Sequence, residues 1–184
     1  MLSFHATPPM RVMVFASQKG GSGKTTLAGH VAVEAERAGA GPVALIDADP
    51  QGSLAKWWNA REARTPAFIQ SQFSSLYQDI ESAREQGFRL VVIDTPPAVT
   101  RAISEVVAHA DLVVVPTRPS PHDLRAVGPS VDIIEGRRKQ MIFVVNAATD
   151  TFNLSATLGG AAISTSGGQS GSHVVREVVS VTVS

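Results

Sequence analysis

Eight consecutive residues near the start of the chain have the composition of a phosphate-binding loop. Residues 19 to 26 read Lys-Gly-Gly-Ser-Gly-Lys-Thr-Thr. Such glycines let successive backbone N–H groups turn toward one anion, and a lysine in the position of Lys24 adds a charge near the β- and γ-phosphates of a nucleotide. The hydroxyl of Thr25 is placed to bind Mg²⁺. The candidate nucleotide-binding residues of this loop are Lys19, Gly20, Gly21, Ser22, Gly23, Lys24, Thr25 and Thr26.

The segments on either side of the loop have the patterns of a strand and a helix. Residues 11 to 16 form a short β-type run, and apolar residues recur at helical spacing from Leu27 to Ala35. A helix that begins near Lys24 would direct its unpaired N–H groups and its positive dipole end at the same phosphates. The alternative is a glycine-rich turn that binds nothing, which requires the strand, the lysine, the hydroxyl and the helix to coincide by accident.

Further strands and helices alternate along the chain. Apolar runs predict strands at 42–46, 89–93, 111–115 and 141–145. Helical patterns predict helices near 53–63, 74–86, 100–109 and 122–135. The strand runs are β-branched and show no polar alternation, which is typical of strands covered on both faces. The predicted fold class is therefore α/β, with a mostly parallel, doubly wound sheet between two helical layers.

Polar residues follow several of these predicted strands directly. Asp47 and Asp49 follow the second strand, Asp94 follows the third, and Asn146 follows the last. In an open α/β sheet, ligands bind outside the carboxyl ends of the strands, so these residues and the glycine-rich loop are expected at one edge. For each aspartate the alternative is a helix cap or a turn residue.

Composition limits the classes of protein and of site. The chain has 184 residues, of which 43% are hydrophobic, with 16 basic and 16 acidic side chains. The absence of cysteine excludes disulfides, thiolate metal sites and iron–sulfur clusters, and the five histidines show no ligand spacing. We expect a cytoplasmic protein, because no apolar run reaches 18 residues and the first nine residues have no export pattern.

One departure from the usual loop pattern points to a particular family. The usual pattern has glycine where this chain has Gln18, and Lys19 adds a second lysine to the loop. This form resembles the deviant Walker A box of the ParA/MinD group of P-loop ATPases, and is closest to the small plasmid and chromosome partitioning ParA branch. The resemblance implies that Lys19 reaches across an ATP-sandwiching homodimer to the partner's phosphates, in a role like that of an arginine finger. Without the resemblance, Lys19 is equally well a solvated loop charge.

The same resemblance assigns roles to the residues at the strand ends. Asp94 matches the Walker B aspartate, which acts on Mg²⁺ largely through its water shell, and Thr25 is the other metal-binding residue. Residues 47 to 51 resemble the Walker A′ motif, in which Asp49 positions or activates the attacking water and Asp47 supports it. Asn146 matches an asparagine that hydrogen-bonds the adenine edge, although it is also an ordinary turn residue. The catalytic candidates are then Lys19, Lys24 and Asp49.

Two further segments have both a structural and a functional interpretation. The proline-rich residues 116 to 121 resemble the segment that lines the base and the dimer contact in small ParA proteins, but a stiff loop would explain them too. Trp57 and Trp58 lie on a predicted helix after Asp49. They could form an exposed partner-binding pair, but we expect at least one ring to pack in the core.

The resemblance covers about residues 10–146, between an N-terminal extension (1–9) and a tail (147–184). It implies a slow, partner-stimulated ATPase that dimerises with ATP, binds DNA non-specifically, and is released from the nucleoid by a ParB-like centromere-binding protein. The tail is rich in Ser, Thr and Gly and carries only Asp150, Arg176 and Glu177 as charged residues. It does not resemble the family's basic C-terminal helices. A misread or truncated frame is one hypothesis, and a flexible or weakly β-forming tail is the structural interpretation.

Two other functions remain open at this point. One is a MinD-like positioning ATPase that works at a membrane, for which residues 174 to 184 offer a single Arg and a single Glu in place of a basic amphipathic helix. The other is an ATP-binding fragment with little turnover, which the unusual composition of the tail favours. We expect no membrane association for this chain.

Overall fold

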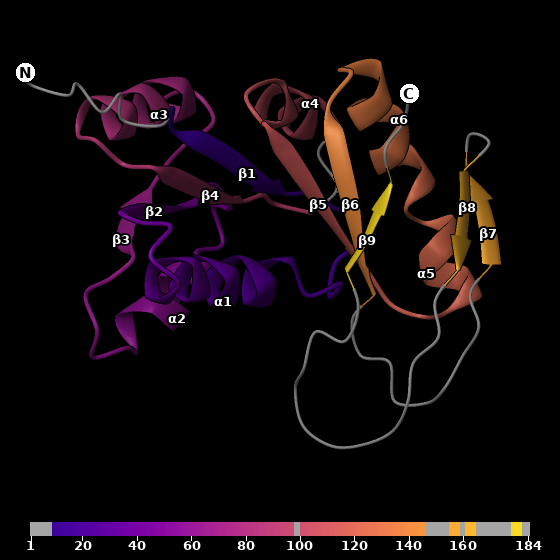
Figure 1. The fold of residues 1–184 in the computed structure, drawn as a ribbon, viewed down its shortest axis with the longest axis horizontal. Helices are drawn as coiled ribbons and strands as arrows, with labels where there is room; N and C mark the ends of the chain where they lie inside the picture. Colours follow the sequence, from indigo (N-terminus) through magenta and orange to yellow (C-terminus); the bar gives the residue numbers. More distant parts are fainter. Residues whose placement is uncertain (1–8, 98–99, 146–154, 159–160, 165–177, 182–184) are drawn as a thin grey trace, which may run out of the picture.

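A central parallel sheet positions the ends of six strands at one edge of the fold (Figure 1). The computed structural model describes residues 9–97, 100–145, 155–158, 161–164 and 178–181. The strands of the sheet are β1 (Arg11–Phe15), β2 (Val43–Asp47), β3 (Ala67–Gln70), β4 (Leu90–Asp94), β5 (Leu112–Thr117), β6 (Gln140–Val145) and β9 (Val178–Val181). Their spatial order is β3-β2-β4-β1-β5-β6-β9, in which β1 to β6 are parallel and β9 pairs antiparallel with β6. The predicted α/β fold class is confirmed.

Helices cover both faces of the sheet. They are α1 (Lys24–Arg37), α2 (Ser53–Asn59), α3 (Leu76–Glu85), α4 (Thr100–Ala108), α5 (Pro121–Arg125) and α6 (Gly128–Gly136). The helices α1 and α2 pack on one face, and α3, α4 and α6 pack on the other (Figure 1). The strands are therefore apolar on both sides, which is why they read as continuous apolar runs in the sequence.

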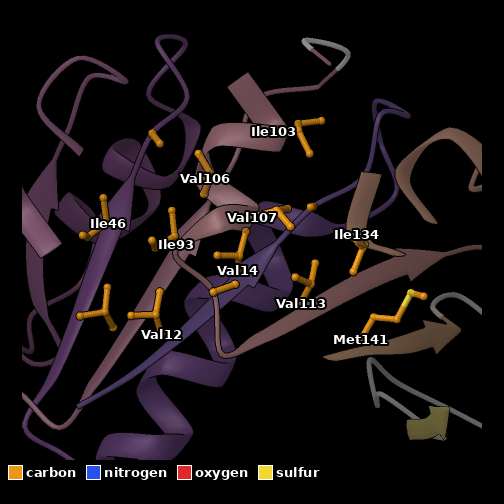
Figure 2. Packing of buried hydrophobic residues seen from close by; sticks show 14 of the residues in the cluster. Val12, Val14, Ile46, Ile93, Ile103, Val106, Val107, Val113, Ile134 and Met141 are labelled. Atoms are coloured by element: carbon orange, nitrogen blue, oxygen red, sulfur yellow. The ribbon is translucent and has the colours of Figure 1, made fainter. Parts of the chain in front are cut away.

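The two faces have separate buried clusters. On the α3–α4–α6 face, Val12 and Val14 of β1 belong to one buried cluster with Ile103 of α4 and Ile134 of α6, and these side chains are labelled in Figure 2. The next residue, Phe15, belongs to the cluster on the other face, together with Leu27 of α1 and residues of β2 and β4. This alternation is the period of two expected for a strand, with both sides buried.

The contact between α1 and α2 depends on a glycine. A Cβ atom placed on Gly29 would lie only 2.8 Å from the ring of Trp57, so a side chain at that position would require either the ring or the two helices to shift. Trp58 stacks on Phe68 of β3 with ring centroids 5.3 Å apart, and its Nε1 donates to the carbonyl oxygen of Pro66 at 3.0 Å. Both tryptophans pack against the α1-side cluster, so the expected core packing is confirmed for the pair.

Three elements differ from the sequence-based expectations. The strand β3 was not predicted, and α2 ends at Asn59 rather than near 63. The helix predicted at 122–135 is two helices, because the chain bends at Val127 and a new helix begins at Gly128 with Pro129 in its first turn. Within residues 147–184 the structure describes β9 and an antiparallel pair, β7 (Ser155–Leu158) and β8 (Ala161–Ser164).

Candidate nucleotide-binding site

The glycine-rich loop lies where β1, β2 and β4 end together. Phe15 at the end of β1 is in register with Asp94 of β4, and Asp94 is in register with Asp47 of β2. The hydroxyl of Thr95 donates to the carbonyl oxygen of Phe15 at 2.8 Å and so ties the end of β4 to the start of the loop. The sheet therefore brings the loop and the two aspartates to one edge, as the sequence predicts.

The backbone of the loop is arranged to receive an anion. Gly21 and Gly23 have φ angles of 73° and 95°, in the left-handed region that glycine adopts without strain. Gly23 is also the N-cap of α1 and has no side chain to cap that helix, and no side chain of the described residues accepts a hydrogen bond from its first turn. Gly20 is exposed on one side of this turn and Thr26 on the other. The unpaired N–H groups at the start of α1 are thus available to phosphate oxygens.

Lys24 places a buried cation beneath the loop. The residue is 6% exposed, and its Nζ donates to the carbonyl oxygen of Lys19 at 3.4 Å. Burial lowers the pKa of Lys24, and the charges of Asp94 and Asp49 oppose that effect. A buried ammonium group with one long neutral hydrogen bond is stabilised by an added anion, which is the expected property of a phosphate-binding lysine. Ser22 is also buried, and its hydroxyl has no hydrogen-bond partner in the described segments.

Lys19 contacts a residue that the sequence did not single out. Its Nζ forms an ion pair with the carboxylate of Asp123 in α5, whose side chain is only 11% exposed. The hydrogen bond from Lys19, followed by that from Ser120, lowers the pKa of Asp123. The signal for this helix start was present, since Ser120 followed by Pro121 and Asp123 is a typical N-terminal capping sequence. The long-range pairing with Lys19 has no such local signal.

Asp94 is a buried carboxylate without a hydrogen-bond partner in the described part of the chain. It is fully buried, and neither carboxylate oxygen has a hydrogen-bond partner among the described residues. Burial raises the pKa of Asp94 to about 7, with further increases from Asp47 and Asp49. The nearby hydroxyl of Thr25, which falls short of hydrogen-bond geometry, and the charge of Lys24 lower it in part. Asp94 and Thr25, the two predicted metal-binding residues, therefore lie side by side.

Asp47 and Asp49 hold the turn between β2 and α2. Asp47 accepts the N–H of Asp49 on one oxygen and the N–H of Ala55 on the other, both at 3.0 Å. Asp49 accepts the N–H of Gln51 at 2.9 Å. Burial raises the pKa of Asp47, while these backbone donors act in the opposite direction. The turn-forming alternative thus holds for both aspartates, and Asp47 also fixes the backbone of Asp49. Their predicted catalytic and supporting roles stay predictions.

The residues present fit a magnesium-bound nucleotide. Orphaned carboxylate oxygens on Asp94 beside the Thr25 hydroxyl are hard oxygen ligands of the kind that Mg²⁺ prefers, and a cation there would favour the charged carboxylate. No three His, Cys, Asp or Glu side chains in the described segments converge to hold a metal ion by themselves. The remaining ligands of Mg²⁺ would be water and phosphate oxygens.

The segment after β5 borders the loop on its other side. A shallow depression there is lined by Ser17, Lys19, Ser22, Pro116, Thr117, Asp123, Ala126 and Val127. Pro116 and Thr117 of the proline-rich segment therefore border the same depression as Lys19 and Ser22 of the loop. Asn146, the predicted adenine contact, lies outside the described residues.

Comparison with known proteins identifies the family. A family model described as "CobQ/CobB/MinD/ParA nucleotide binding domain" matches residues 13–180. The chain belongs to this family. The ParA/MinD resemblance inferred from the loop is thereby confirmed, and so is a P-loop ATPase fold for this family member.

Two curated relatives and one solved structure illustrate the range of the family. The chain is 45% identical over 130 residues to maintenance of carboxysome distribution protein A of Gloeobacter kilaueensis, which covers 65% of this chain and 58% of that protein. It is 35% identical over 127 residues to protein ParA of Rhizobium radiobacter, and the match covers 68% of this chain and 56% of that protein. The chain superposes with a TM-score of 0.62 on the septum site-determining protein MinD of Pyrococcus horikoshii, which was solved with Mg-ADP. The two sequences are 15% identical, and the match covers 74% of this chain and 70% of that chain.

These similarities extend over only part of each relative. The chain spans a little under three fifths of the two curated relatives. None of the helices in the described segments is both long and apolar enough to cross a membrane.

Proposed function

We propose that this chain binds Mg-ATP in the loop of residues 19 to 26 and hydrolyses it slowly. The observation that carries the proposal is the combination of the buried ammonium group of Lys24 in the glycine-rich loop with the buried carboxylate of Asp94, which has no hydrogen-bond partner among the described residues. Each is costly to bury alone, and a magnesium-bound phosphate chain compensates both.

In this proposal each candidate residue has a defined role. Lys24 and the N–H groups at the start of α1 bind the phosphates, and Thr25 and Asp94 hold Mg²⁺. The bound ion would neutralise charge that develops on the phosphates. Asp49, held by Asp47, orients the attacking water and accepts its proton as the oxygen bonds to the γ-phosphorus and the bond to ADP breaks.

The biological role that fits this chemistry is partition. Lys19 acts in trans in an ATP-dependent homodimer, so dimerisation requires it to leave Asp123. The dimer binds non-specific DNA on the nucleoid, and a ParB-like partner stimulates hydrolysis and releases it. The resemblance of the loop to the small ParA branch and the 35% identity to protein ParA support this role.

A second candidate is distribution of a protein cargo rather than of DNA. The 45% identity to a carboxysome distribution protein favours it. The two candidates share the ATP-dependent dimer and differ in the partner that stimulates hydrolysis.

ATP hydrolysis by the purified chain tests the ATPase activity that both candidate roles require. Wild type should turn over ATP slowly, while Lys19→Ala and Asp49→Ala should lose turnover and keep nucleotide binding. The exposed residues Lys56 and Asp132 supply matched controls, because alanine there removes the same charges away from the loop. Turnover should change with non-specific DNA only if the partition role is correct. Wild type that binds ATP and never hydrolyses it would refute the ATPase and leave the incomplete-fragment interpretation.

A further inference from the structure

Arg118 lies over the phosphate loop from the neighbouring strand. It follows directly after β5, which pairs with β1. A Cβ atom placed on Gly21 would lie 3.9 Å from Nη2 of Arg118, and apart from Gly21 and its two chain neighbours no other heavy atom of the described residues lies within 4 Å of that position. The guanidinium group therefore lies close to the loop turn at Gly21.

The backbone around Arg118 is fixed. Its carbonyl oxygen accepts the N–H of Ser120 at 2.8 Å and the hydroxyl of Thr117 at 3.4 Å. Pro119 restricts the backbone on the C-terminal side. The backbone of Arg118 is thus held beside the loop, while its side chain remains exposed.

The positive charge of Arg118 is not neutralised within the described part of the chain. No hydrogen bond or ion pair of its guanidinium group was found among the described residues. The carboxylate in reach is Asp123, and it is already occupied by Lys19 and Ser120. Arg118 lowers the pKa of Asp123 less than Lys19 does. Lys19, Arg118 and Asp123 together leave one uncompensated positive charge on the outer side of the loop.

The position of Lys24 indicates which phosphate Arg118 would meet. In loops of this kind the lysine reaches the β- and γ-phosphates. Nζ of Lys24 lies at the carbonyl oxygen of Lys19, so the terminal phosphates are expected beside residues 19 to 21. Arg118 covers the same part of the loop at Gly21.

We propose that Arg118 is a phosphate-binding residue of this site, whose guanidinium group donates to oxygens of the terminal phosphate of ATP and so favours ATP over ADP. The proposal rests on the proposed nucleotide-binding function and adds a residue to it. A guanidinium group suits this task because its planar, paired donors match the spacing of two oxygens on one phosphate, whereas an ammonium group acts as a point charge without that fixed geometry.

The test is nucleotide affinity rather than activity. Mg-ATP and Mg-ADP are titrated by calorimetry into wild type, Arg118→Ala, Arg118→Lys and the control Arg125→Ala, which removes an exposed arginine from α5. Loss of a charged hydrogen-bond donor predicts an ATP affinity about tenfold weaker for Arg118→Ala, with a smaller loss for ADP. Arg118→Lys should recover part of the affinity, and Arg125→Ala should match wild type.

Three results would overturn the proposal, and they are distinguishable. If Arg118→Ala binds ATP as tightly as Arg125→Ala, Arg118 is a solvated surface residue. If ATP and ADP weaken equally, the guanidinium group does not contact the terminal phosphate. If wild type binds neither nucleotide, the proposed function itself fails and this inference fails with it. Because Arg118 is exposed, equal melting temperatures for all four proteins are expected and would exclude misfolding as the cause.

Discussion

Replacing Asp94 by asparagine isolates the effect of a buried carboxylate on stability. In the native chain the pKa of Asp94 is raised from 3.8 to about 7, chiefly by burial. In the unfolded chain the carboxyl has its ordinary pKa. Between these two values the native state holds a proton that the unfolded state has released, so the free energy of unfolding falls as the pH rises.

The magnitude follows from the difference between the two pKa values. One pKa unit corresponds to about 1.4 kcal/mol, so complete ionisation of Asp94 opposes folding by about 4 kcal/mol. Most of this change falls within an accessible range, and we expect Asp94 alone to lower the free energy of unfolding by about 3 kcal/mol from pH 5 to pH 8. In Asp94→Asn this contribution is absent. The cost of burying the asparagine amide is the same at pH 5 and pH 8, so it cancels when the two free energies of unfolding are subtracted.

The assay is urea unfolding at pH 5 and pH 8 with a metal chelator and without nucleotide. Fluorescence of Trp57 and Trp58, which pack between α1, α2 and β3, reports the transition. The control is Asp132→Asn, which removes an exposed carboxylate from α6. It should retain the pH dependence of wild type.

A pH dependence in Asp94→Asn equal to that of wild type would refute the reasoning. Asp94 would then be ionised at neutral pH in the native chain, with a counter-charge that the site geometry does not reveal. The argument that a cation is needed beside Asp94 would lose its basis.

Three further predictions concern packing around the site. Gly29→Ala should lower the free energy of unfolding by about 1–2 kcal/mol, because its Cβ would lie 2.8 Å from the ring of Trp57. The matched change Gly136→Ala, where no atom lies within 4 Å, should be neutral or stabilising by up to about 1 kcal/mol. Thr95→Val removes a buried 2.8 Å hydrogen bond to the end of β1 and should cost about 1 kcal/mol in the same assay. Trp58→Phe keeps the stacked ring but loses the indole donor, and should also cost about 1 kcal/mol.

Each of these predictions has a clear contrary result. Equal stability of the two alanine variants would mean that Trp57 moves aside freely and does not set the α1–α2 distance. An unchanged Thr95→Val protein would mean that water replaces the hydroxyl. If Trp58→Phe lowers the free energy of unfolding by much more than about 1 kcal/mol, the packing of the indole ring contributes more than its hydrogen bond does.

The sequence predicted the strands that carry the site, because those strands are buried on both faces. The runs that became β1, β2, β4, β5 and β6 are mostly apolar and rich in β-branched residues, and such runs have few alternatives. The strand β3 was missed because it has four residues, none fully buried, at the edge of the sheet. Its side chains do not form a pattern that differs from a loop.

The helix after β5 was predicted as one element because its apolar spacing continues through a break. Gly128 and Pro129 are the local signal for that break, and the structure begins α6 there. At the site, the loop and the aspartates could be predicted, since both depend on local order along the chain. The pairing of Lys19 with Asp123 could not, because it joins residues 104 positions apart and depends on how α5 packs.

The hydrogen bond at the start of the loop also bears on how the chain acquires its binding competence during synthesis. The N–H of Gln18 donates to the hydroxyl of Ser130 in α6 at 3.2 Å, across 112 positions of sequence. Contacts of such separation form late, after the intervening chain has been made and packed. The loop emerges early from the ribosome but can reach its final shape only once α6 is in place. Nascent chains that end before α6 should therefore bind nucleotide poorly, so that ATP is taken up only by molecules whose sheet is already assembled.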